Sequence, residues 1–247
     1  RPVSHRVYGS NDWYCRYGEG NSAAEIIKDA QMYSAMSPSG TNRPYAVIDA
    51  GWHVVGGCEK GPWNRGNDRF PSMPDLAAEI RKAGARPGIW IRPLGAPDDA
   101  PSGWRLSRDA KYFDPTVADA LHRVKEDIAR LHDWTYDLIK FDFTTFDILG
   151  KWGFQMADDV TSGGWAFADK GVTTAEVISK LYQTIREAAG DSLVMGCNTL
   201  SHLSAGLFEL NRIGDDTSGK EWERTRKMGV NTLAFRAPQH ETFYQAD

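Results

Sequence analysis

The sequence predicts an α/β fold, a (β/α)8 TIM barrel that is truncated after about six βα units. Strand-like and helix-like segments alternate along the chain, as they do in βα units that build a parallel sheet. The 247 residues also suit a single large domain with an ample core. An open doubly wound sheet is the alternative, but it would leave the aromatic loops without a common mouth. We therefore expect one barrel domain over residues 1–247.

The first half of the chain supplies the first three strands. Asn and Ser are favoured at helix N-caps, and Gly ends a helix well because it tolerates positive φ. In chain order we expect a strand at 7–13, a helix at 22–36 capped by Asn21 or Ser22, a strand at 45–52, a helix at 72–83 closed by Gly84, and a strand at 86–94.

The second half continues the alternation around one long loop. We expect a helix at 117–131, a strand at 136–143, a helix at 173–189, a strand at 192–198, a short helix at 201–209 and a strand at 210–217. The loop at 144–171 contains Trp152, Phe154, Trp165 and Phe167. Loops of that length inside a compact domain are usually functional.

The end of the chain indicates an incomplete barrel. Residues from 221 onward look helical, and 241–247 look like the opening of a seventh strand. A closed barrel of this type needs about eight strands, and an open sheet exposes edges that proteins normally cover. We therefore expect the sequence, which starts at Arg1, to be a processed or shortened piece of a longer protein whose strands seven and eight lie largely outside it.

Composition narrows the function classes. The net charge is −4 with both signs interspersed, so the footprint of a nucleic-acid binder is missing. No apolar run reaches about 18 residues, so we expect no membrane-spanning segment. Cys15, Cys58 and Cys197 lack a metal-binding spacing and allow at most one disulfide, and Cys197 reads as a buried free thiol. We predict neither a metal nor a cofactor.

Charged residues near two predicted strand ends indicate a functional site. Lys140 and Asp142 lie two apart on the expected strand at 136–143, so they should share a face and stabilise one another. Taken alone, this pair fits a structural ion pair equally well. A second strand-like segment contains Arg212 and ends at Asp216. Two carboxylates at two strand ends indicate a glycosidase.

The other strand ends add polar and aromatic groups, in keeping with the catalytic face of such barrels. Carboxylates and amides can hold sugar hydroxyls while an apolar sugar face lies on tryptophan. We therefore expect an oligosaccharide or glycoside as the substrate. The strand-end residues are Asp12, Trp13, Asp49, Trp52, Trp90, Arg92, Lys140, Asp142, Cys197, Asn198, Arg212 and Asp216.

Several segments, in this order and spacing, resemble the α-galactosidase (melibiase) group of retaining glycoside hydrolases, families 27 and 36 of clan D. They are AVIDAGW at 46–52, DRFPSMPDL at 68–76 with KAG at 82–84, PGIW at 87–90, KFD at 140–142 and RIGDD at 212–216. The resemblance runs along almost the whole chain.

The resemblance implies a retaining mechanism on a barrel, with Asp142 as nucleophile and Asp216 as acid/base. Retention needs the two carboxyl groups about 5 to 5.5 Å apart. Lys140 would keep Asp142 ionised, and Arg212 is expected to contact the sugar or Asp215 rather than Asp216. Trp13, Asp49 and Trp90 would line the sugar subsite. The substrate-binding candidates are Trp13, Asp49, Trp52, Trp90, Lys140, Cys197, Asn198 and Arg212.

Two positions depart from the family pattern. Ala50 follows Asp49 where many α-galactosidases carry two adjacent acids, and Asn198 stands where a member can carry Glu. The sugar could therefore be galactose or a related pyranoside, such as an N-acetylgalactosaminide or an arabinopyranoside. By analogy, an accessory β-sandwich and an extracytoplasmic location are expected.

Two alternatives stay open. One is a carbohydrate-binding, degenerate barrel without catalysis. The other is a lyase in which Lys140 forms a Schiff base, although a neighbouring carboxylate would favour the charged and unreactive lysine.

Overall fold

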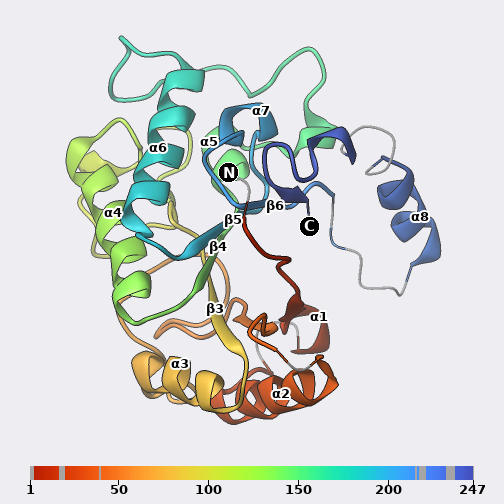
Figure 1. Ribbon diagram of the computed structural model, residues 1–247. Coiled ribbons are helices and arrows are strands. Elements are labelled where there is room, and N and C mark those ends of the chain that lie inside the picture. The colour runs from red at the N-terminus through yellow and green to blue at the C-terminus, as the bar shows by residue number, and fades with distance from the viewer. Residues whose placement is uncertain are drawn as a thin grey trace.

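The computed structural model describes residues 3–16, 20–38, 40–214, 216, 221–231 and 237–246. Within this part, parallel strands follow one another in chain order from β1 to β7 in a single sheet. They are β1 Gly9–Asn11, β2 Tyr45–Ile48, β3 Arg86–Ile91, β4 Leu138–Phe141, β5 Leu193–Gly196, β6 Leu210–Asn211 and β7 Gln245–Ala246. Figure 1 shows the sheet curling, as in most of a (β/α)8 barrel. The predicted barrel fold is confirmed.

Helices connect the strands and pack outside them, with α2 and α3 below and α4 and α6 to the left of the sheet in Figure 1. This arrangement follows from parallel pairing in chain order, because each connection must return along the outside of the sheet. The α-helices are α1 Trp13–Arg16, α2 Ala23–Met36, α3 Met73–Lys82, α4 Ala118–Asp133, α5 Thr144–Leu149, α6 Thr174–Ala188, α7 Ser201–Ser204 and α8 Trp222–Asn231; the 3-10 turns are η1 Ser102–Trp104, η2 Gly153–Gln155 and η4 Ala237–Gln239.

Side-chain caps fix the starts of the long helices. Ser22, not Asn21, caps α2, with its Oγ accepting from the backbone N of Glu25 at 3.3 Å. Asn21 instead donates to the carbonyl of Ala50 at 3.2 Å. Thr173 and Glu176 form a reciprocal capping box at the start of α6. Such caps satisfy backbone N–H groups that have no partner within the helix.

The core is built from strands that are buried on both faces. All residues of β2 and β4 are buried, as expected of a parallel sheet covered by helices. An aromatic cluster lies beside β3, where Trp52, Trp63 and Trp90 are at most 1% exposed. This cluster supports the carboxyl end of β3, next to the predicted site.

The two ends of the sheet are joined by one side chain. Gln245 of β7 accepts from the backbone N of Val7 at 3.1 Å and donates to the carbonyl of His5 at 2.9 Å. Figure 1 places the N and C labels near one another. The opening of a seventh strand predicted at 241–247 is thus confirmed at Gln245–Ala246, which pairs with β6.

Several segments differ from their prediction. The helix expected at 201–209 ends at Ser204, and the strand expected at 210–217 ends at Asn211, so Asp216 lies outside β6. The residues after Asn11 leave the sheet and form α1, although a strand was expected up to residue 13. The expected loop at 144–171 begins with α5 and contains η2, because a sharp turn at Phe143 starts a new helix directly after β4. Among the described helices, none is long and apolar enough to cross a membrane.

Candidate active site

Asp142 follows the last residue of β4 and is held by donors from three elements. Its Oδ2 accepts from Trp90 Nε1 at 3.1 Å, and its Oδ1 accepts from the backbone N of Phe143 at 2.7 Å. Asn198 Nδ2 donates to the same Oδ1 at 2.5 Å. These bonds fix the carboxylate of Asp142, which is 6% exposed, at the carboxyl edge of the sheet.

The turn that places Asp142 is strained. Phe143 has φ +64°, in the left-handed region that costs a bulky residue about 1–3 kcal/mol. The surrounding structure holds it there: the guanidinium carbon of Arg92 lies 4.2 Å from the centroid of the Phe143 ring, and the backbone N of Asp147 donates to the Phe143 carbonyl at 2.8 Å. The turn and the orientation of Asp142 therefore depend on Arg92 and α5.

Arg92 and Asp147 form a buried ion pair below this turn. Arg92 Nη2 lies 2.6 Å from Asp147 Oδ1, with the side chains 6% and 0% exposed. Arg92 also donates to the carbonyl of Cys58 and to the hydroxyl of Tyr112, at 3.1 and 2.9 Å. Burial raises the pKa of Asp147 to about 7, although Arg92 opposes the shift. The pair fastens β3 to α5.

Lys140 pairs with Asp49, which corrects the expectation that Asp142 is its partner. Lys140 Nζ donates to Asp49 Oδ2 at 2.8 Å, and Asn11 Nδ2 donates to the same oxygen at 2.7 Å. The reason is local geometry: β4 ends at Phe141, so Asp142 lies in the turn and not on the pleat of Lys140. Burial disfavours the charge of Lys140, but Asp49 and other nearby charges hold its pKa above the ordinary value.

Asp216 lies beyond β6 and is held by Arg212 and Tyr14. Arg212 Nη2 donates to Asp216 Oδ1, which corrects the expectation that Arg212 avoids this residue. The Tyr14 hydroxyl is hydrogen-bonded to Asp216 as well. Burial would raise the pKa of Asp216, but the Arg212 charge and the two hydrogen bonds outweigh it and lower that pKa. Asp215 lies outside the described residues.

Tyr14 was not among the predicted site residues, although its neighbour Trp13 was. The α1 turn brings Tyr14 from the end of β1 to Asp216 in the segment beyond β6, a contact between distant segments that leaves no local pattern. Burial and the charge of Asp216 raise the pKa of Tyr14 to about 12, despite the opposing charge of Arg212. The phenol is therefore protonated at neutral pH and can donate to Asp216.

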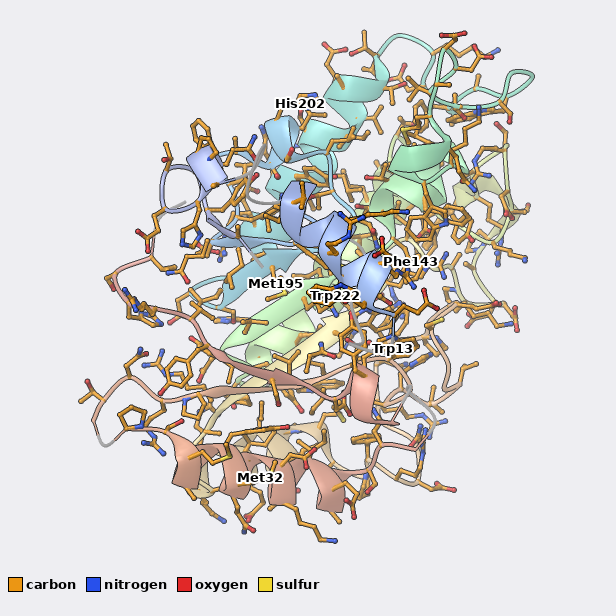
Figure 2. The ribbon with its side chains drawn as sticks, turned by 90° about the vertical axis from the view of Figure 1, so that its right-hand side faces the viewer. Trp13, Met32, Phe143, Met195, His202 and Trp222 are labelled. Carbon is orange, nitrogen blue, oxygen red and sulfur yellow. The ribbon has the colours of Figure 1, made fainter. Side chains whose placement is uncertain are left out.

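The predicted sugar-stacking tryptophans lie at different depths. Trp90 is 1% exposed and reaches the site only through its bond to Asp142. Trp52 is fully buried, and its Nε1 donates to the Trp90 carbonyl at 2.8 Å, so it supports Trp90 in the core instead of lining a mouth. Trp13 is partly buried, and Figure 2 shows Trp13 and Phe143 at the same end of the sheet.

Cys197 and Asn198 link the two carboxylates. Arg212 Nη1 donates to Cys197 Sγ at 3.3 Å, while the adjacent Asn198 holds Asp142. Cys197 is a buried free thiol, and burial first, then Asp142, raise its pKa. A connected set of contacts through Asn198, Cys197 and Arg212 therefore links Asp142 to Asp216.

Two further features complete the site. A cavity of about 220 Å³ adjoins it, lined by residues of the segment 145–156 and of the ends of β5 and β6. Among the described residues, no group of three or more His, Cys, Asp or Glu side chains could hold a metal ion. The side chain of Cys15 lies outside the described part.

Solved structures share the fold of this chain. No protein-family model matches the sequence. The chain is similar to the GH27 β-L-arabinopyranosidase of Geobacillus stearothermophilus bound to arabinose, with a TM-score of 0.70 and 16% identity over 99% of this chain and 61% of that one. The shared fold is that of a barrel on which glycoside hydrolases are built.

An α-galactosidase and an isomalto-dextranase share the fold too. The Thermus thermophilus α-galactosidase in complex with stachyose matches with a TM-score of 0.66 and 18% identity, covering 100% of this chain and 54% of that one. The isomalto-dextranase of Arthrobacter globiformis with panose matches at 0.60 and 16%, covering 88% and 40%. The chain thus spans about half the length of such enzymes, and the resemblance to the α-galactosidase group is confirmed at the level of the fold.

Proposed function

We propose that this chain carries the catalytic centre of a retaining α-glycoside hydrolase, with Asp142 as nucleophile and Asp216 as acid/base. The observation that supports this most is the pair of carboxylates after β4 and β6, connected through Asn198, Cys197 and Arg212. Retaining hydrolysis requires two carboxyl groups that face one glycosidic bond from opposite sides.

In the first step Asp142 attacks the anomeric carbon and forms a bond to it, while the bond to the leaving oxygen breaks and Asp216 gives that oxygen its proton. In the second step Asp216 takes a proton from water, the water oxygen attacks the anomeric carbon, and the Asp142 carboxylate leaves. The three donors on Asp142 hold it in the orientation for attack.

The acid step requires a protonated Asp216, yet Arg212 and Tyr14 lower its pKa here. A sugar that draws the Arg212 guanidinium onto its own hydroxyls removes the strongest stabiliser of the Asp216 charge. Its pKa then rises toward the value that a general acid needs. Arg212 therefore couples substrate binding to protonation of Asp216.

The proposed substrate is a terminal α-linked galactose or a related pyranoside. Asp49 is buried and already accepts from Lys140, Asn11 and the backbone N of Ala50, so it contributes fewer free lone pairs than an unpaired acid would. Ala50 provides no second carboxylate beside it. Fewer acceptors favour a pyranoside with fewer hydroxyl contacts, such as an arabinopyranoside.

The test is a screen of the full-length protein against p-nitrophenyl α-galactoside, α-N-acetylgalactosaminide, β-L-arabinopyranoside and α-glucoside. We expect release of nitrophenol from at least one of them, its loss in Asp142→Asn, and recovery of turnover by azide in Asp142→Gly. Full activity in both Asp142 and Asp216 variants would contradict the assignment.

A second candidate is a carbohydrate-binding barrel without turnover. It is favoured by the ion pair that keeps Asp216 ionised in this structure. Sugar binding by the full-length protein, measured by calorimetry, with no hydrolysis of any tested glycoside would favour this reading.

A further inference from the structure

We propose that the cavity beside the two carboxylates is the subsite for the leaving group of the glycoside, and that Trp152 is its stacking platform. This inference rests on the proposed hydrolase function. The cavity holds about 220 Å³, and its lining includes Lys151, Trp152, Met156, Asn198, Ser201 and Arg212.

The position of the cavity along the sheet assigns it to the leaving group. Asp49 directly follows β2, and Trp90 lies near the end of β3, so both are on one side of Asp142 along the sheet. The cavity lies on the other side, over the ends of β5 and β6. The leaving group departs from the face of the anomeric carbon opposite Asp142 and toward the acid Asp216, which lies beyond β6, so it is directed toward the side of the sheet that the cavity occupies.

Two residues connect the cavity to the reacting groups. Asn198 lines the cavity and donates to Asp142, and Arg212 lines it and donates to Asp216. A group that fills the cavity is then separated from each carboxylate by one side chain, Asn198 on the side of Asp142 and Arg212 on the side of Asp216. This is the position of the first unit beyond the bond that is cleaved.

Trp152 is held rigidly as a platform. Its ring stacks on Phe146, with centroids 4.7 Å apart and planes inclined by 21°, and its centroid lies 5.4 Å from that of Phe143. Its backbone N donates to Gln155 Oε1 at 2.9 Å. Phe146 and Phe143 hold the half-buried indole in place, and the part of Trp152 that lines the cavity is available to a ligand. An indole face suits the apolar face of a sugar ring.

The remaining lining indicates a hydroxyl-rich ligand. Thr199 and Ser201 bring hydroxyl groups to the cavity. Lys151 donates to the carbonyl of Asp159 at 3.0 Å, and an ammonium group has three N–H donors, so it can bind further acceptors. Together with the platform, this chemistry fits a neutral sugar unit as the leaving group.

The experiment compares two substrates of the same sugar in the full-length protein. For galactose these are melibiose, whose glucose unit would fill the cavity, and α-galactosyl fluoride, whose fluoride would not. We expect Trp152→Ala to lower kcat/KM for melibiose about tenfold or more, while the value for the fluoride changes less than about twofold. Trp152→Phe should keep most of the melibiose activity because it keeps an aromatic face.

A matched control comes from the same loop. Trp165 packs edge-on against Phe167, 5.0 Å between centroids, and is not part of the cavity lining. Trp165→Ala should leave the ratio of the two kcat/KM values unchanged. Equal losses on both substrates in Trp152→Ala, or no loss on either, would overturn the proposed subsite while leaving the hydrolase function intact.

A binding measurement separates the two proposals. If the wild-type protein cleaves neither substrate, the hydrolase function fails, but glucose binding can still be followed by saturation-transfer NMR. Signal transfer to glucose that is lost in Trp152→Ala and kept in Trp165→Ala supports the cavity as a sugar site. Transfer that persists in Trp152→Ala overturns it.

Discussion

Asn198 donates from Nδ2 to Oδ1 of Asp142 over 2.5 Å, so a neutral amide occupies the position next to the proposed nucleophile. At this position the family can carry a glutamate. Because an amide can donate where a carboxylate cannot, Asn198 orients Asp142 without adding charge. In this chain, the position that the resemblance assigns to sugar recognition contacts the proposed nucleophile.

This contact predicts the behaviour of two variants. Asn198→Ala removes one charge-assisted bond of about 1.5–3 kcal/mol, so we expect kcat to fall roughly 10- to 100-fold. Asn198→Asp should lower kcat at least as far, because an ionised carboxylate cannot donate to Asp142 and places a second negative charge beside it. Steady-state kinetics of the two variants at neutral pH test both. A wild-type kcat in Asn198→Asp would argue against the contact.

Tyr14 should set the pH range of the acid step. Tyr14→Phe removes a donor to ionised Asp216, so the pKa of Asp216 rises from its lowered value. Because the general acid must be protonated, activity is lost above that pKa, and the basic limb of the profile should move to higher pH. Tyr8→Phe is the control, because the Tyr8 hydroxyl donates to the Asn42 carbonyl away from the site. A basic limb that stays in place or moves downward in Tyr14→Phe would contradict this role.

Local signals explain what the sequence could predict. Helix starts at Ser72 and Thr173 were visible because a capping side chain lies within three residues of the N–H it binds. Buried strands such as β4 were visible as short apolar runs between turns. Asp142 could be located for the same reason, because it directly follows β4. Asp216 was expected at the end of a strand, but β6 ends at Asn211 and Asp216 lies in the segment beyond it.

Contacts between distant segments explain the rest. The spacing of Lys140 and Asp142 predicted that the two side chains pair. The left-handed turn at Phe143 takes Asp142 out of the strand, and Lys140 pairs with Asp49 instead. The contact of Tyr14 with Asp216 joins the segment after β1 to the segment beyond β6, which no spacing along the chain encodes. A tryptophan in the sequence can be an exposed sugar-stacking residue or a core residue. The burial of Trp52 in the structure shows that it belongs to the core.

The ion pair of Lys140 and Asp49 should be needed for stability as well as for the site. Lys140→Met leaves the Asp49 carboxylate buried without its cation, which typically costs about 3–5 kcal/mol of unfolding free energy. Lys140→Met combined with Asp49→Leu removes both charges and should recover most of that loss. Urea unfolding of the two variants measures the difference. Equal destabilisation in the single and double variants would mean that packing, not charge pairing, determines the effect.

The ion pair of Arg92 and Asp147 should position Asp142 through the turn at Phe143, and its contribution to stability should depend on pH. Arg92→Met removes the charge that opposes the raised pKa of Asp147, about 7, so the folded state holds the Asp147 proton even more tightly. An acid with a raised folded pKa stabilises the protein fully below its unfolded pKa of about 3.9, and this contribution is lost as pH rises through the folded pKa.

The destabilisation by Arg92→Met should therefore be smallest near pH 4 and grow as the pH rises past about 7. Urea unfolding across this range measures it. Adding Asp147→Leu should restore stability, yet kcat should stay low because no guanidinium then lies over Phe143 to hold the strained turn. Recovery of kcat together with stability would mean that the pair supports the fold but does not position Asp142.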